Sequence, residues 1–176
     1  MGRDKALLEV EGIPCIARVT SALVEAGCEP IRIAVAQPED VERYGAVLPA
    51  GADVEWVLDS VPHAGPIEAM VEALSDPLVG EVESIQLCPV DVPWITAELF
   101  LELEKTLGSD DLLAIPADPR RTHPLLARVR PTLASAIGED RRPLHIQFAE
   151  LEHSTLLADS LILRNVNTPA DLSDSD

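Results

Sequence analysis

The chain of 176 residues is poor in aromatic side chains and contains no long apolar run. Aromatic residues make up 3% of it, so its core must be built from Leu, Ile, Val and Ala. No stretch of about 18 uncharged apolar residues occurs, which excludes a membrane-spanning helix. The apolar content of 47% excludes a disordered chain and predicts a single domain over residues 1–176, with a polar tail at 173–176.

Basic residues are also scarce, and lysine is the scarcest of them. Lys5 and Lys105 stand beside 11 arginines and 31 acids. The net charge of −18 repels a phosphate backbone, so we expect no nucleic acid partner. An acid-rich, lysine-poor surface suits a high-salt cytoplasm, because salt screens its self-repulsion. The charged N-terminus shows no signal peptide, and we expect a cytoplasmic protein.

Several common catalytic and metal-binding patterns are absent. The cysteines Cys15, Cys28 and Cys88 lie far apart and form no C-x-x-C pair, which argues against a zinc site or a disulfide framework. His145 and His153 have no metal-ligand spacing. Without G-x-S-x-G, a complete Walker A loop or H-E-x-x-H, hydrolase triads and zinc proteases are not expected.

Strand-like and helix-like apolar patterns alternate along the chain. They predict strands at 31–36, 54–58, 84–88, 112–116, 124–129 and 160–166, and helices at 13–26, 38–44, 67–74, 97–107, 131–137 and from 168 onward. The short loops favour an α/β fold, a Rossmann-like open and mostly parallel sheet with helices on both faces. In such a sheet the ligand lies beyond the carboxyl ends of the strands, where Asp59 and Asp91 fall.

Two segments carry acids or bases that suit a nucleotide and a metal. Asp91 follows an apolar strand between Pro89 and Pro93, and Mg²⁺ prefers one or two such carboxylates with phosphate oxygens and water. The alternative is a turn or capping aspartate. The stretch Gly2–Lys5 resembles the end of a phosphate-holding loop, with backbone N–H groups and one lysine. The alternative is a frayed, charged N-terminus.

Four further groups of polar residues are candidates, each with a structural alternative. Asp59 could accept hydrogen bonds from a base or ribose, or be a loop carboxylate. The segment 120–124, with His123, could receive a phosphate or form a surface salt-bridge cluster. Arg142 is similar, and capping of a helix C-terminus would explain it. Asn165 and Asn167 alternate on one face of an extended segment, where they could bind a flat heterocycle or form a turn-and-cap motif.

The ordered set of segments resembles the molybdenum cofactor guanylyltransferases, the MobA-like nucleotidyltransferase family. Met1–Leu8 looks like the end of that family's LAGG-x-S-x-R-M-G-x-D-K signature, and Leu87–Pro93 looks like its C-x-x-D-x-P strand end. Asp59-Ser60 is similar to the family's acidic turn, and Gly65-Pro66 to its G-P-L segment. Thr122–Leu125 is similar to its H-P motif, and Asn165–Pro169 to its N-x-N-T-P motif. The resemblance covers residues 1 to about 172, and its specificity lies in the order of the motifs.

The resemblance implies a fold of the nucleotide-diphospho-sugar transferase type and transfer of GMP from GTP to molybdopterin, with release of pyrophosphate. It gives catalytic roles to Lys5, which would hold the triphosphate, and to Asp91, which would hold Mg²⁺. Residues on the nucleotide side would also include Gly2, Arg3, Asp59 and Gly65, and those on the pterin side Asn165, Asn167, Arg142 and His123. Molybdoenzymes or other cofactor-assembly proteins are the protein partners that it implies.

The chain departs from the family pattern in three places. The first strand and the LAGG-x-S-x-R part of the loop are absent, so we expect an N-terminally truncated domain whose start codon was assigned too late. Glu68 and Ala69 follow Gly65-Pro66-Ile67 in place of a small residue and a second glycine, and Ala36 stands where the family often has Asn. Three alternatives therefore stay open: a cytidylyltransferase, a sugar-phosphate nucleotidyltransferase, or a non-catalytic binding protein of this fold.

Overall fold

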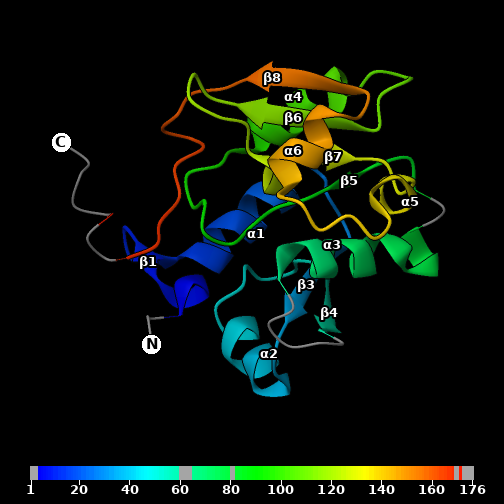
Figure 1. Cartoon of the computed structure of the whole chain (residues 1–176). Helices are drawn as coiled ribbons and strands as arrows, with labels where there is room; N and C mark the ends of the chain where they lie inside the picture. Colours follow the sequence, from blue (N-terminus) through cyan, green and yellow to red (C-terminus); the bar gives the residue numbers. More distant parts are fainter. Residues whose placement is uncertain (1–3, 60–64, 80–81, 169–170, 172–176) are drawn as a thin grey trace. The chain divides into compact units, whose positions relative to one another are not determined.

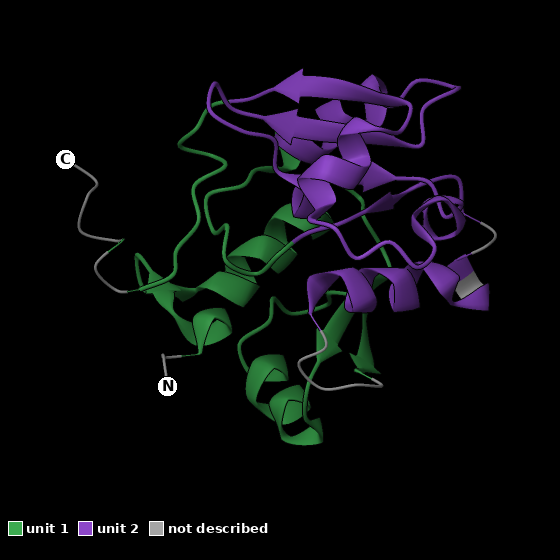
Figure 2. Ribbon diagram, in the orientation of Figure 1, with its two compact units in different colours: residues 1–60, 89–98, 159–176 green, residues 61–88, 99–158 purple. Residues whose placement is uncertain are grey.

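The structure is a computed structural model that describes residues 4–59, 65–79, 82–168 and 171. Its contacts divide the chain into two compact units (Figure 2). The first comprises residues 1–60, 89–98 and 159–176, and the second comprises residues 61–88 and 99–158. The single domain over 1–176 stays a prediction. Within the described ranges, no helix combines the length and hydrophobicity that a membrane span requires.

The first unit contains two pairs of strands. The 3-10 helix η1 (Lys5–Leu7) leads into β1 (Glu9–Val10), which pairs antiparallel with β2 (Ile13–Pro14). The strands β3 (Ile31–Val35) and β4 (Val54–Leu58) pair in parallel. A parallel pair needs a crossover, and α2 (Pro38–Gly45) lies within it.

The helix α1 (Cys15–Glu25) shows why these residues fold as they do. Its apolar side chains recur at helical spacing, and Ile16, Val19 and Leu23 are buried. Gly27 has a φ of 73°, a left-handed conformation that glycine adopts without strain, and the chain leaves the helix there as the sequence predicts. α2 begins with Pro38 and carries two acids in its first turn, where the helix dipole favours them.

The second unit is built on a four-stranded sheet with the order β5-β7-β6-β8. Its strands are β5 (Ile85–Gln86), β6 (Leu113–Ala117), β7 (Arg128–Val129) and β8 (His153–Leu157). β8 runs parallel to β6, while β7 runs antiparallel to both β5 and β6. The α/β class with parallel strand pairs is confirmed, and this sheet is mixed because a short connection after β6 turns the chain back into β7.

Helices cover the sheet of the second unit. Three of them, α3 (Pro66–Ser75), α5 (Leu133–Ile137) and α6 (Leu144–Ala149), join β6 and β7 in one hydrophobic core. The buried members of this core are Met70, Leu74, Leu113, Ile115, Ala127, Val129, Leu133, Ile137, Leu144 and Phe148. Figure 1 shows α6 in front of the strands and α4 (Ala97–Thr106) behind them. A short 3-10 helix, η2 (Pro77–Val79), follows α3.

Two element predictions are wrong, and two elements of the structure are not predicted. Residues 160–166 form turns and irregular chain rather than a strand, since the N–H groups of Ile162 and Leu163 donate to the carbonyl of Asp159. Residues 124–129 divide into the 3-10 helix η3 (Pro124–Leu126) and β7. The two unpredicted elements are α6 and β8. Of the predicted helix from 168 onward, residues 169–170 and 172–176 lie outside the described residues.

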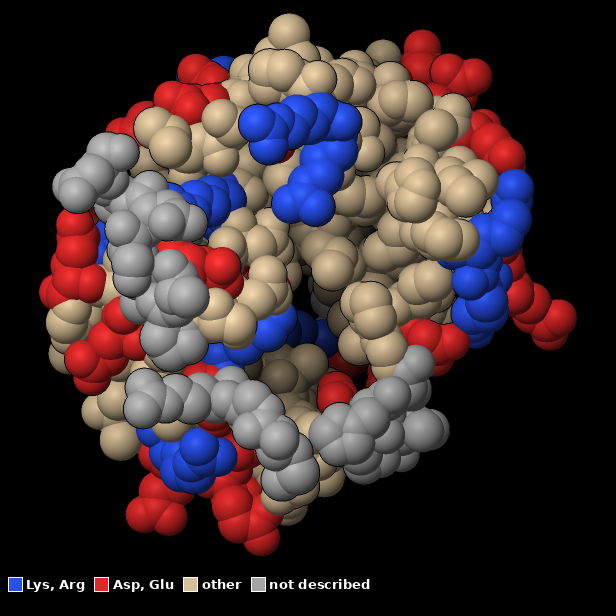
Figure 3. Space-filling model, turned by 60° about the vertical axis from the view of Figure 1, so that its left-hand side comes forward, with Lys and Arg blue, Asp and Glu red and all other residues tan. Residues whose placement is uncertain are grey.

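The surface reflects the composition. On the face shown in Figure 3, acidic side chains lie around much of the margin, and Lys and Arg lie among them. Many arginines are paired with acids; Arg32 with Glu55 at 2.8 Å and Arg141 with Glu68 at 2.7 Å are examples. The net charge of −18 remains after all such pairs are made.

Candidate functional site

Asp91 lies in a turn of the first unit that is tied to the segment around Val166. β5 ends at Gln86, so Asp91 follows the strand at a short distance instead of ending it. The carbonyl of Asp91 accepts a hydrogen bond from the N–H of Val166 at 2.8 Å. Val90 and Trp94, on either side of Asp91, pack against a small core that contains Val166. Packing and a backbone hydrogen bond therefore fix the position of this carboxylate.

The carboxylate of Asp91 contacts two other predicted site residues, and one of these two contacts a third. Its Oδ1 accepts a hydrogen bond from Asn165 Nδ2 at 3.1 Å, and its Oδ2 lies 3.2 Å from Lys5 Nζ. Lys5 Nζ also donates to Asn167 Oδ1 at 2.6 Å. We call Lys5, Asp91, Asn165 and Asn167 the Asp91 cluster. All four belong to the first unit but come from three distant parts of the sequence.

The alternation of side chains in residues 165–167 explains how both asparagines reach the cluster. Val166 is fully buried with Leu8, Val10 and Cys15. The side chains on either side of it turn to the cluster instead: Asn165 donates to Asp91, and Asn167 accepts from Lys5. The predicted shared face of the two asparagines is thus what the structure contains.

A second set of polar contacts fixes the residue next to Lys5. Asp4 caps η1, with its Oδ1 accepting a hydrogen bond from the N–H of Ala6 at 3.1 Å. Its Oδ2 accepts from Arg43 Nη2 and from the Tyr44 hydroxyl, both at 2.9 Å. The pKa of Tyr44 is raised to about 12; the larger cause is burial of the phenol, and the second is its hydrogen bond to Asp4. We call the contacts of Asp4 with Arg43 and Tyr44 the Asp4 anchor. The sequence gives no signal for it, because these residues lie far apart along the chain.

The donor atoms of the Asp91 cluster fit a phosphate-bound Mg²⁺. Mg²⁺ is usually held by one or two carboxylates, while phosphate oxygens and water supply the other ligands. Asp91 offers such a carboxylate, with both oxygens already serving as acceptors for Asn165 and Lys5. The ammonium of Lys5 is the group that now neutralises Asp91. Within the described ranges, no three His, Cys, Asp or Glu side chains gather as an all-protein metal site would require.

The predicted nucleotide-side residues outside the cluster have different surroundings. Gly2 and Arg3 lie outside the described residues. Asp59 follows β4 in the first unit, and its N–H donates to the carbonyl of Val35 at 2.9 Å, which extends the parallel ladder by one bond. Gly65 belongs to the second unit, where it stands at the N-cap of α3 with a φ of 109° and a ψ of 170°.

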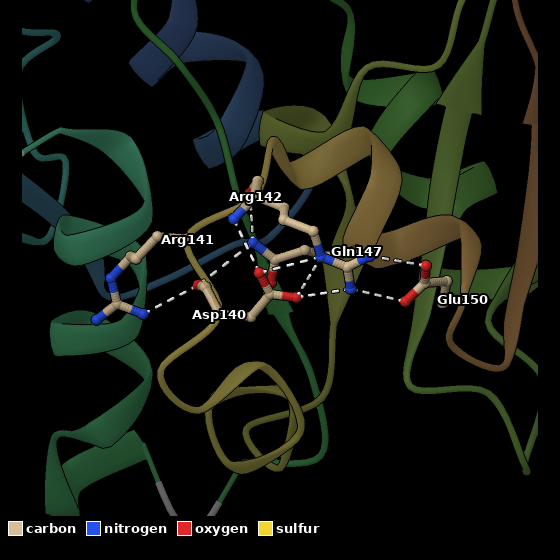
Figure 4. Close-up of polar contacts among 5 residues, drawn as sticks. All are labelled: Asp140, Arg141, Arg142, Gln147 and Glu150. Carbon is tan, nitrogen blue, oxygen red and sulfur yellow. Dashed lines mark hydrogen bonds and ion pairs between the residues drawn. The ribbon is translucent and has the colours of Figure 1, made fainter.

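Arg142 lies in the second unit, between two carboxylates (Figure 4). Its Nη2 donates to Asp140 Oδ2 at 2.7 Å and to Glu150 Oε2 at 2.8 Å. The hydrogen bond to Glu150 is the larger cause, and that to Asp140 the second, of a raised pKa of Arg142. In return, Arg142 lowers the pKa of both acids. Gln147 adds a hydrogen bond to the carbonyl of Arg142. Binding of an anion by this guanidinium would have to compete with both acids.

His123 also lies in the second unit and is nearly buried against an acid. Its Nε2 lies 3.0 Å from Asp118 Oδ2, and an ionised carboxylate can only accept, so Nε2 carries the hydrogen. The other oxygen of Asp118 accepts from the N–H groups of Arg120 and Arg121, which closes the turn before His123. The pKa of Asp118 is lowered to about 2, mainly by the hydrogen bond from His123 and to a smaller extent by the backbone N–H groups of the turn.

Known proteins resemble this chain over nearly all of its length. A family model described as the MobA-like NTP transferase domain matches residues 1–149. The probable molybdenum cofactor guanylyltransferase of Synechococcus elongatus is 30% identical over 181 residues, which cover 97% of this chain and 89% of the relative.

Solved structures share the fold at much lower sequence identity. The 4-diphosphocytidyl-2C-methyl-D-erythritol synthase of Anaerococcus prevotii has a TM-score of 0.74 at 13% identity, covering 94% of this chain and 85% of that one. The manganese complex of Rv0371C from Mycobacterium tuberculosis has a TM-score of 0.72 at 16% identity, covering 98% of this chain and 91% of that one. These likenesses confirm the nucleotide-diphospho-sugar transferase-like fold.

Proposed function

Because the chain belongs to the MobA-like NTP transferase family and is therefore a nucleotidyltransferase, we propose that it transfers GMP from GTP to molybdopterin and releases pyrophosphate. The names of its relatives support the two substrates. The observation that carries the proposal is the Asp91 cluster, where an ammonium, a carboxylate and two amides meet within 3.2 Å. A cytoplasmic location, where GTP is made, belongs to the same proposal.

The proposed reaction needs no nucleophile from the protein. A phosphate oxygen of molybdopterin attacks the α-phosphorus of GTP, and the bond from that phosphorus to the β-phosphate oxygen breaks as pyrophosphate leaves. The protein then has to position the two substrates and to compensate the charge that gathers on the departing oxygen. Mg²⁺ bound to the phosphates would supply Lewis-acid stabilisation of that charge.

Each member of the cluster has a proposed role that suits its chemistry. Asp91 is the carboxylate that would hold Mg²⁺. Lys5 would exchange Asp91 for the triphosphate, where its ammonium compensates the charge of the leaving pyrophosphate. Asn165 and Asn167, whose amides both donate and accept, would face the pterin ring. A solved neighbour that contains manganese supports a divalent cation in proteins of this fold.

The predicted residues outside the cluster complete the proposal. Gly2 and Arg3 would contact the phosphates, Asp59 the guanine end, and Gly65 would lie on the nucleotide side. Arg142 and His123 would face the pterin. Each of the last two is now held by acids of its own unit, so a role in binding requires that Arg142 gives up Asp140 or Glu150.

Pyrophosphate release by the purified chain tests the proposal. The assay combines molybdopterin with GTP or CTP and MgCl₂, at moderate and at high salt because of the net charge of −18. We expect release that requires Mg²⁺ and prefers GTP. A preference for CTP would instead identify the cytidylyltransferase alternative, and a folded chain that transfers neither nucleotide would refute the proposal.

The Asp91→Asn variant tests the carrying observation. It keeps the shape of the side chain but removes the charge, so we expect transfer to fall by about 100-fold or more, as when a group that stabilises the transition state is lost. Asp110→Asn is the matched control, since Asp110 is exposed in a turn of the second unit. Equal turnover by both variants, with unchanged circular dichroism, would remove Asp91 from the proposed metal site.

A further inference from the structure

The contacts of Asp4 connect the segment that carries Lys5 to a helix far along the chain. One carboxylate oxygen of Asp4 accepts from the N–H of Ala6, and the other accepts from Arg43 and Tyr44 of α2. Ala6 is buried, so the backbone on the far side of Lys5 is fixed as well. Lys5 thus stands between an anchored residue and a buried one.

Arg43 and Tyr44 are themselves held in place, which makes them suitable anchors. Arg43 Nη1 donates to Asp40 at 2.6 Å, and Nη2 donates to Asp4 at 2.9 Å. The guanidinium also lies 5.6 Å from the centre of the Tyr44 ring, within cation–π range. These contacts point the guanidinium and the phenol at the same carboxylate oxygen. Two donors at one oxygen leave Asp4 little freedom to turn.

The lysine side chain explains why such an anchor matters. Its ammonium sits on a flexible four-carbon stem, so a defined position of Nζ requires a fixed backbone as well as partners at its end. The partners at the end are Asp91 and Asn167, at 3.2 and 2.6 Å from Nζ. The side chain of Lys5 is 43% exposed, and ion pairs this open are weak by themselves.

We propose that Arg43 and Tyr44 are positioning residues, which by holding Asp4 set the place of the Lys5 ammonium against Asp91 and Asn167. They act through Asp4 and touch none of the proposed reacting atoms. The effect on transfer rests on the proposed function, whereas the placement of Lys5 does not. The two parts therefore need separate measurements.

The placement can be measured by NMR, because the chain has just two lysines, Lys5 and Lys105. In protein labelled with ¹³C at lysine Cε, two Cε–Hε signals are expected, and a Lys5→Met variant assigns them. We expect the Lys5 signal of the wild type to be displaced from the position of a free lysine. Asp4→Asn and Tyr44→Phe should move it toward that position and leave the signal of Lys105 unchanged.

Arg32→Gln is the matched control, because it removes an arginine from another ion pair of the same unit, Arg32 with Glu55 at 2.8 Å. It should leave the Lys5 signal in place. Tyr44→Phe removes one hydroxyl and no charge, so it keeps the test valid if Asp4→Asn weakens the fold. A Lys5 signal that stays in place in both Asp4→Asn and Tyr44→Phe would overturn the proposal.

Kinetics test the consequence for transfer. We expect Asp4→Asn and Arg43→Gln each to lower kcat/KM by about 10- to 150-fold, the range for one lost charge-assisted hydrogen bond. In a Lys5→Met background, Asp4→Asn should cause no further loss, because the group that it positions is gone. Full, additive losses in that background would show that Asp4 does not act through Lys5. A wild type without transfer would refute the proposed function alone and leave the NMR result standing.

Discussion

The ionisation of Tyr44 offers a direct test of the Asp4 anchor, since Tyr44 is the single tyrosine of the chain. Its hydroxyl donates to Asp4 Oδ2 at 2.9 Å. Burial disfavours the charged phenolate, and so does the negative charge of Asp4, so both raise the pKa of Tyr44, from 10.0 to about 12.

The magnitude and its sign follow from that difference. At about 1.36 kcal/mol for each pH unit, it corresponds to about 2.7 kcal/mol in favour of the neutral phenol, which solvent screening of the partly exposed ring reduces to about 1–2 kcal/mol. The folded chain holds this proton more tightly than the unfolded chain. The stabilisation is therefore complete below pH 10.0 and is lost as the pH rises through about 12.

The assay is the ultraviolet absorbance of tyrosinate, followed upward from neutral pH with circular dichroism as a check on folding. The two tryptophans do not ionise in this range, so the titration reports Tyr44 alone. We expect a midpoint of about 12 for the wild type. In Asp4→Asn the midpoint should fall toward the ordinary value but stay above it, because burial remains. Identical midpoints in two folded proteins would refute the hydrogen bond between Tyr44 and Asp4.

Three further predictions concern stability. Gly65→Ala should lower the free energy of unfolding in denaturant by about 1–3 kcal/mol, because a φ of 109° and a ψ of 170° suit glycine alone. Gly45→Ala inside α2 is the control and should be neutral or stabilising. Equal effects of the two variants would contradict the backbone conformation of Gly65. Phe148→Ala should lower the free energy of unfolding by about 3–5 kcal/mol, since Phe148 is fully buried. The control Leu157→Ala, at a residue that is 79% exposed, should lower it by less than about 0.5 kcal/mol. A small loss at Phe148 would mean that the core is packed differently. Added KCl should raise the Tm, because salt screens the repulsion within a net charge of −18, and a Tm that does not respond would show that repulsion is unimportant.

The sequence predicted best those elements whose apolar pattern is strong. The β-branched runs at 31–35 and 54–58 are strands of the first unit, and the helical spacing before Gly27 is α1. β8 gave little signal, because it is an edge strand with polar residues at its start and exposed positions along it. The apolar run 161–163 misled in the opposite direction: it reads as a strand, but turn hydrogen bonds to Asp159 fold it back on itself.

The candidate site was predictable only in part, and for a similar reason. Lys5, Asp91, Asn165 and Asn167 stand in motifs that can be recognised one by one, and the structure brings them together. The roles of the four in catalysis and binding stay predictions. Arg43 and Tyr44 stand in no motif, and on a helix of mostly polar residues they look like ordinary surface positions. Only the folded chain shows that they converge on Asp4.

The helix α2 has a property that extends beyond the anchor, since none of its residues is buried. Apolar burial is what usually makes a helix as stable as the whole domain, so α2 should unfold locally at a free energy well below that of global unfolding. Its amide hydrogens should exchange with solvent faster than those of α1, whose apolar side is buried. Because Asp4 links α2 to the segment that carries Lys5, a ligand that orders this segment should slow amide exchange in α2 without touching the helix. Slower amide exchange in α2 would then report that a ligand is bound at the segment that carries Lys5.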